Sequence, residues 1–144
     1  MNLTYQIKQW YFAHPLGFTI LRVALGVCLV IQGIYFLNNV QALQKVIEGS
    51  LLNKLNISIL LTIIITWAHL FGGTFIILGL ITRIAVWVQV PITLGAIIFI
   101  NKNDIFTAHF DLLLSAFILL SLIFFAFEGA GPISMDEYVK KELL

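Results

Sequence analysis

Residues 61–100 read LTIIITWAHLFGGTFIILGLITRIAVWVQVPITLGAIIFI, and Arg83 is the only Lys, Arg, Asp or Glu among them. Two apolar runs, residues 57–80 and 83–100, meet here. Each is close to the roughly 17 to 25 residues that cross a bilayer as a helix. The connection between them, Leu80-Ile81-Thr82, is very short. The stretch is therefore predicted to form an antiparallel hairpin of two transmembrane helices.

Two further apolar runs flank this hairpin, at residues 16–37 and 106–127. The chain has 144 residues, of which 60% are hydrophobic and 10% charged, whereas about 25% of the residues in soluble domains are charged. The segments outside the four runs are too short to bury a core of their own. The sequence therefore predicts an all-α fold, a polytopic membrane protein. Its four transmembrane helices form an antiparallel bundle within a single membrane domain, residues 1–144.

Residues 40–56, between the first two apolar runs, have a pattern of their own. Their apolar residues recur every three to four positions, with polar residues on the other side; the apolar positions are Val40, Leu43, Val46, Ile47, Leu51 and Leu55. This spacing predicts a short helix lying in the membrane interface. The alternative is a plain polar connection that breaks at Gly49-Ser50.

Charge and cysteine content exclude several classes of function. The formal net charge is +1, so no basic field exists to attract a nucleic acid. The single cysteine, Cys28, excludes an internal disulfide, a two-cysteine redox pair and a multi-cysteine metal site within one chain. Four crossings place both ends on one side of the membrane. The excess of Lys and Arg on that side predicts cytoplasmic N- and C-termini.

Polar side chains inside the apolar runs are the candidate functional residues, because a charge at the centre of a membrane helix costs about 2.5 to 3.5 kcal/mol. The candidates are Arg22, His69, Gln89 and Asp111, one from each predicted helix. At about 100° per residue, each shares a helical face with small or polar residues. Such faces turn toward neighbouring helices, so the four side chains form a candidate intramembrane polar site.

The four candidates are expected at different levels of the membrane. At about 1.5 Å per residue, Arg22 and Gln89 lie about 4 to 7 Å to the cytoplasmic side of the midplane, with His69 near it. Asp111 lies about 8 Å beyond the midplane on the outer side. The four therefore form a ladder.

Each candidate also has a structural interpretation. Arg22 can extend toward the headgroups, while His69 and Gln89 can form hydrogen bonds that fix helix packing. Asp111 can cap the backbone or pair with Lys102.

Haem and metal sites are not predicted. The two intramembrane histidines, His69 and His109, differ in depth by about 11 Å, whereas bis-histidine haem ligation needs both imidazoles at one level. No third ligand of suitable geometry accompanies them, which excludes zinc. We also expect no covalently bound cofactor.

Three stretches carry a likeness to a known family. They are LRVALGVCLVIQGIYF at residues 21–36, AHLFGGTFIILGLITRIA at residues 68–85 and EGAGPISMDEY at residues 128–138. In these stretches the chain resembles the DoxX family of small four-helix bacterial membrane proteins. The family's inward arginine corresponds to Arg22, and its hairpin arginine corresponds to Arg83.

The chain departs from the family pattern near the end of the first helix. The family often has His-Gly and then Lys there, but this chain has Gln32-Gly33 and then Tyr35-Phe36. A role that needs a titratable His or Lys at this place is therefore not expected.

The resemblance implies a bacterial inner membrane and membrane redox chemistry, including complexes of the thiosulfate:quinone oxidoreductase type. We therefore expect a DoxX-like integral membrane subunit associated with quinone-linked or other membrane redox chemistry, with quinone as the candidate cofactor. Whether the chain is itself an enzyme stays open. One alternative is a non-catalytic accessory or scaffold subunit of a larger membrane complex, and another is a proton or small-solute pathway. The expected partners are the lipid bilayer and either other membrane subunits or further copies of this chain.

Overall fold

The structure is a computed structural model that describes residues 2–49, 57–100 and 105–143. The regular elements in these ranges are all helices, which confirms the all-α fold class. They are α1 (Leu3–Ala13), α2 (Pro15–Asn38), α3 (Val40–Glu48), α4 (Ser58–Leu78), α5 (Thr82–Ile100), α6 (Ile105–Glu128) and α7 (Met135–Leu143).

The four long helices, α2, α4, α5 and α6, match the four apolar runs to within two residues at each end. Helix α2 begins at Pro15, where a missing N–H costs nothing. Helix α4 ends at Leu78 and is followed by Gly79, whose φ of +68° is the left-handed conformation that commonly terminates helices. By length and composition, α2 and α4 could each cross a membrane, whereas the described parts of α5 and α6 carry shorter apolar stretches.

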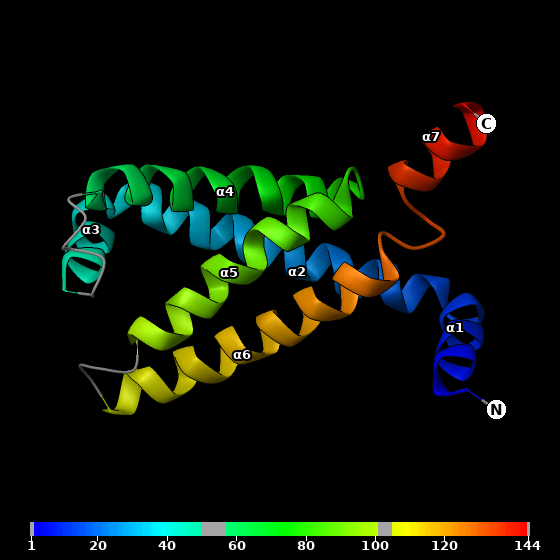
Figure 1. The fold of residues 1–144 in the computed structure, drawn as a ribbon, viewed down its shortest axis with the longest axis horizontal. Helices are drawn as coiled ribbons and strands as arrows, with labels where there is room; N and C mark the ends of the chain where they lie inside the picture. The colour runs from blue at the N-terminus through cyan, green and yellow to red at the C-terminus, as the bar shows by residue number, and fades with distance from the viewer. Residues whose placement is uncertain (1, 50–56, 101–104, 144) are drawn as a thin grey trace.

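The long helices pack as two pairs, α2 with α4 and α5 with α6, and the pairs join where α4 meets α5 (Figure 1). Glycines allow the first pair to approach closely. A Cβ added to Gly26 would lie 2.7 Å from the carbonyl oxygen of Gly73, and one added to Gly73 would lie 2.8 Å from that of Gly26. Gly33 similarly faces Leu70. Because the facing residue on α4 moves back as α2 advances, α2 and α4 run antiparallel, and their small residues allow the close approach.

Large apolar side chains occupy both the centre and the outside of this arrangement. Leu29, Val86 and Phe125 are fully buried between the helices. Trp87 on α5 is 56% exposed and Phe117 on α6 is 60% exposed. Exposed apolar surfaces of this extent are suited to contact with lipid or with another membrane protein.

The short helices lie at the two ends of the molecule, with α1, α7 and both termini at one end and α3 at the other (Figure 1). Helix α3 confirms that residues 40–48 are helical, and it ends just before Gly49. Glu48 accepts a hydrogen bond at 3.4 Å from Ser58 at the start of α4. Residues 50–56 of the predicted interfacial segment lie outside the described residues. The placement of α3 in the membrane interface stays a prediction.

Candidate functional site

Arg22 lies at the end of the bundle where α4 turns into α5. Its side chain is only 3% exposed. The guanidinium donates hydrogen bonds to the carbonyl oxygens of Ala130 and Ile133, the second at 3.1 Å. Gly79 makes room for it, because an added Cβ would lie 3.0 Å from Arg22 Cζ. Arg22 therefore binds the segment between α6 and α7, whose carbonyls lie outside both helices.

Asp136, in the first helical turn of α7, also contacts the connection between α4 and α5. Its carboxylate accepts hydrogen bonds from the N–H of Ile81 at 2.7 Å and of Thr82 at 3.1 Å. Its own N–H donates to the carbonyl oxygen of Gly79 at 2.9 Å. Because Thr82 begins α5, the carboxylate caps the positive end of that helix. Ile81 has a φ of +49°, a strained conformation for a β-branched residue, and its N–H is fixed by Asp136.

Together the contacts of Arg22 and Asp136 form what we call the clasp, which ties residues 129–136 to α2 and to the turn between α4 and α5. Asp136 was not among the four candidate residues. One signal was available, since Ser134-Met135-Asp136-Glu137 fits the Ser-x-x-Glu pattern of a helix start. In the structure the N–H of Glu137 donates to the Ser134 hydroxyl at 3.2 Å. The backbone partners of Arg22 carry no such signal, because every residue has a carbonyl group.

His69 lies further along α4 and is 4% exposed. Its Nδ1 is 2.9 Å from the carbonyl oxygen of Ile65. Since that oxygen only accepts, Nδ1 carries the proton and Nε2 is the acceptor. The ring packs edge-on against Phe36 of α2, with centroids 5.2 Å apart. Thus His69 contacts α2 through its ring, and its hydrogen bond stays within its own helix.

The depth of the Arg22 guanidinium in the bundle differs from the depth that was predicted for it. The ten residues from His69 to Gly79 correspond to about 15 Å of helix, and the Arg22 guanidinium lies at Gly79. The predicted difference in depth was only about 4 to 7 Å, from residue counting. The discrepancy arises because a helical side chain points toward the N-terminus of its helix, which takes the long Arg22 side chain to the end of the bundle.

Gln89 joins α5 to α4. It is fully buried, and its Nε2 donates to the carbonyl oxygen of Ala68. Gly72 leaves space for this contact, because an added Cβ would lie 2.5 Å from Gln89 Nε2. In the described part of the chain, Gln89 Oε1 and Thr93 Oγ1, one turn further along α5, are buried without a hydrogen-bond partner. An unpaired buried polar group costs about 1 to 3 kcal/mol, so each of these two atoms would be stabilised by a hydrogen-bond partner.

The fourth candidate, the Asp111 side chain, lies outside the described residues. Ser115, one turn further along α6, is buried, as expected for the predicted inward face of that helix. Within the described ranges, no three His, Cys, Asp or Glu residues form a group that could hold a metal ion.

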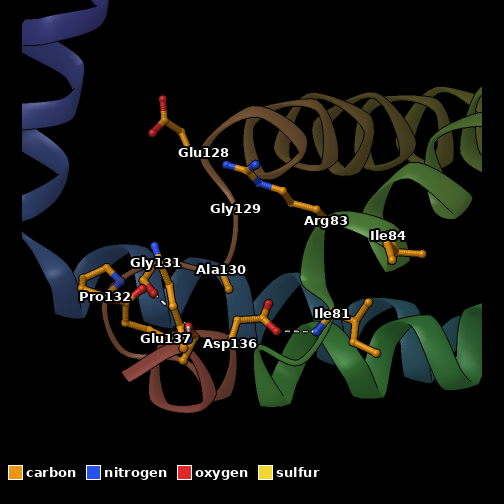
Figure 2. Close-up of a pocket in the computed structure, with 12 residues that line it drawn as sticks. Ile81, Arg83, Ile84, Glu128, Gly129, Ala130, Gly131, Pro132, Asp136 and Glu137 are labelled. Carbon is orange, nitrogen blue, oxygen red and sulfur yellow. Dashed lines mark hydrogen bonds between the residues drawn. The ribbon is translucent and has the colours of Figure 1, made fainter. Parts of the chain in front are cut away.

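A cleft of about 610 Å³, which we call the junction cleft, lies beside the clasp. It is bounded by the start of α5, the end of α6, and α7 with its preceding loop (Figure 2). Its charged lining residues are Arg83, Glu128, Asp136, Glu137 and Lys140. The Arg83 side chain extends from α5 toward the end of α6 (Figure 2).

The family model described as DoxX matches residues 17–102, more than half of the 144 residues. The chain belongs to the DoxX family. Comparisons with curated proteins and with solved structures gave no match. Membership of the DoxX family, together with the apolar helices, makes this chain a membrane protein.

The three stretches that carry the DoxX likeness meet at the clasp. Residues 21–36 supply Arg22, residues 68–85 supply the turn, and residues 128–138 supply Asp136 and the bound carbonyl groups. The third stretch lies beyond the residues matched by the DoxX model, yet its backbone and Asp136 bond directly to the other two. In this DoxX chain the clasp therefore joins the three stretches directly to one another.

Proposed function

We propose that this DoxX-family chain is an integral subunit of a quinone-linked redox assembly in a bacterial inner membrane. Its four long helices cross the bilayer as one antiparallel bundle, residues 1–144 form one membrane domain, and both termini are cytoplasmic. The apolar outer faces of α5 and α6 support four crossings. Both termini at one end of the molecule support an even number of crossings (Figure 1).

The observation that supports the redox proposal is that Gln89 Oε1 and Thr93 Oγ1, one turn apart on α5, are both buried without a hydrogen-bond partner among the described residues. Gln89 Oε1 accepts a hydrogen bond from a hydroxyl of the reduced quinol, and the Thr93 hydroxyl donates to a carbonyl of the oxidised quinone. Both atoms are buried on one face of the helix, and a hydrogen bond that is shielded from water is strong. A few polar groups within an apolar site are the usual means of orienting a small ligand.

A partner subunit supplies and removes the electrons. Cys28 is the only cysteine, so one chain offers neither a dithiol pair nor the cysteine ligands of an iron–sulfur cluster. The role of this chain is then to bind and orient the quinone headgroup next to the partner's redox centre.

Thr93→Val tests the proposal, with Thr74→Val as a matched control. Thr74 is exposed, and its hydroxyl already bonds at 2.7 Å to the carbonyl of Leu70. Binding of a short-chain quinol to the purified chain is measured by equilibrium dialysis. We expect Thr93→Val to weaken binding about tenfold, the effect of losing about 1.4 kcal/mol, and the control to bind like the wild type.

The same variant gives a second readout. Without quinol, Thr93→Val is expected to melt at or above the wild-type temperature, because valine removes an unpaired buried hydroxyl. Wild-type binding by Thr93→Val, or no quinol binding by the wild type, would refute the quinone site.

A non-catalytic accessory subunit is the second candidate function. It is favoured by the fact that Arg22, His69 and the Gln89 amide all donate hydrogen bonds to backbone carbonyls, contacts that stabilise the bundle. In that case, deleting the chain destabilises a partner complex, and Thr93→Val restores the complex as well as the wild type does, without any quinol bound. No observation on the described residues favours a proton or solute pathway.

A further inference from the structure

We propose that the junction cleft binds the headgroup of phosphatidylethanolamine from the surrounding bilayer. Arg83 and Lys140 hold the phosphate, and Glu137 holds the ammonium group. This inference goes beyond the proposed redox function and depends only on the placement of the bundle in a membrane.

The cleft lies at the level where headgroups are found. Helix α4 ends at Leu78, α5 begins at Thr82 and α6 ends at Glu128, so the apolar helical segments stop beside it. Ile81 is 47% exposed and Ile84 is 65% exposed at its rim. An apolar rim next to charged groups suits a lipid, whose acyl chains can continue along the exposed outer face of α5 while the headgroup stays in the cleft.

Arg83 is placed to bind a phosphate. Among the described residues, its hydrogen bond is a long one, 3.4 Å from Nη2 to the carbonyl oxygen of Phe127. Gly129 lets the guanidinium lie against the backbone, since an added Cβ would be 3.1 Å from Arg83 Nε. Figure 2 shows the side chain extending across the top of the cleft. A guanidinium with donors to spare matches phosphate oxygens in a bidentate arrangement.

The charges of the lining favour a zwitterion over an anion. Two cations, Arg83 and Lys140, face three carboxylates, but Asp136 is already bonded to two backbone N–H groups. The Glu128 carboxylate points away from the other lining residues (Figure 2), so two cations and the Glu137 carboxylate remain, which a phosphate with an ammonium group complements. An anionic glycerol headgroup would offer Glu137 hydroxyl donors but no cation. A choline headgroup has no N–H to donate to it.

The size of the cleft is also suitable. Its volume of about 610 Å³ falls within the roughly 300 to 1,000 Å³ of small-molecule sites, which is ample for a phosphoethanolamine group. A free phosphoethanolamine compound shares this chemistry. The apolar rim formed by Ile81 and Ile84 is the reason to assign the cleft to the lipid.

Native mass spectrometry of the full chain in detergent tests this assignment. The protein is mixed with equal amounts of phosphatidylethanolamine, phosphatidylcholine and phosphatidylglycerol that carry identical acyl chains, and the retained lipid is counted. We expect phosphatidylethanolamine to be retained about tenfold over the other two, a difference of about 1.4 kcal/mol, because only its ammonium group can donate N–H hydrogen bonds to Glu137. Arg83→Gln and Glu137→Gln should each reduce this retention about tenfold.

Lys141→Gln is the matched control, because Lys141 lies on the same helix as Glu137 but does not line the cleft. It should retain phosphatidylethanolamine like the wild type, and a melting curve for each variant identifies any that fails to fold. Should Arg83→Gln misfold, Glu137→Gln tests the site by itself. Equal retention of the three lipids, or wild-type retention by the folded variants, would overturn the headgroup site. Free phosphoethanolamine binding as tightly as the lipid would overturn the lipid assignment.

Discussion

Replacing Gly73 by alanine is expected to force α2 and α4 apart. The added Cβ would lie 2.8 Å from the carbonyl oxygen of Gly26 and 2.9 Å from the backbone nitrogen of Val30. Both atoms belong to the backbone of α2, so no side-chain rotation relieves the contact. Inserting a methyl group into a tightly packed site costs about 1 to 3 kcal/mol.

The control is Gly17→Ala near the start of α2, where an added Cβ meets nothing within 4 Å. Replacing glycine by alanine within a helix gains up to about 1 kcal/mol in either variant. The difference between the two variants therefore isolates the cost of packing, about 2 kcal/mol. For a chain of this size that corresponds to about 4 to 8 °C in melting temperature.

Cys28 provides the assay for this pair of variants. It is the only cysteine, it is partly buried, and it packs against the core from α2. A maleimide that fluoresces on reaction with a thiol therefore reports when α2 separates during heating in detergent. A Gly73→Ala protein that melts at or above the temperature of Gly17→Ala would refute the packing argument.

Three further predictions concern the clasp and the topology. Arg22→Met should release the segment after α6, because its bound carbonyls lose a charged donor; limited trypsin digestion should then cut near the C-terminus several-fold faster, and an unchanged rate would contradict the clasp. Asp136→Ala should lower stability by about 1 kcal/mol through loss of a helix cap, whereas Glu142→Ala, on the same helix, should melt like the wild type. In a background without the native cysteine, an impermeant maleimide applied to intact cells should label Lys45→Cys but not Lys141→Cys. The reverse pattern would contradict cytoplasmic termini.

The long helices could be predicted from sequence because their signal is local. Pro15 precedes the apolar run at residues 16–37, and Gly79 lies near the end of the run at residues 57–80. The structure places the start of α2 and the end of α4 at these residues. The close approach of α2 and α4 also followed from small residues at helical spacing. Helix α7 could have been predicted from the Ser134 to Glu137 pattern, but a polar terminal segment without an apolar run gave no reason to look for a helix.

The clasp could not be predicted, because its partners are distant in sequence and partly backbone. Asp136 lies 54 and 55 residues from the N–H groups that it caps. The carbonyl groups that bind Arg22 are 108 and 111 residues away from it. A helical wheel placed Arg22 on an inward face correctly. It could not show that the side chain extends to the end of the bundle, where it binds the connection to α7 instead of joining His69 and Gln89.

The sequence predicted which residues are buried in the candidate site better than it predicted their contacts with one another. The inward faces of α4 and α5 were read correctly, since His69, Gln89 and Thr93 are all buried. The hydrogen bond from Gln89 to Ala68 depends on the missing Cβ of Gly72, a contact between helices whose register the sequence does not specify. The unpartnered atoms that now carry the quinone proposal are likewise visible only once the helices are packed.

The central claim is that this DoxX-family chain binds quinone as part of a redox assembly. The most direct measurement is purification of the tagged chain from bacterial membranes in a mild detergent, followed by identification of bound proteins by mass spectrometry and of bound quinone by absorbance. The account predicts a stoichiometric redox-active membrane partner together with retained quinone, and loss of the quinone but not of the partner in Thr93→Val. A homo-oligomer without quinone, or a partner complex whose quinone content Thr93→Val leaves unchanged, would contradict it.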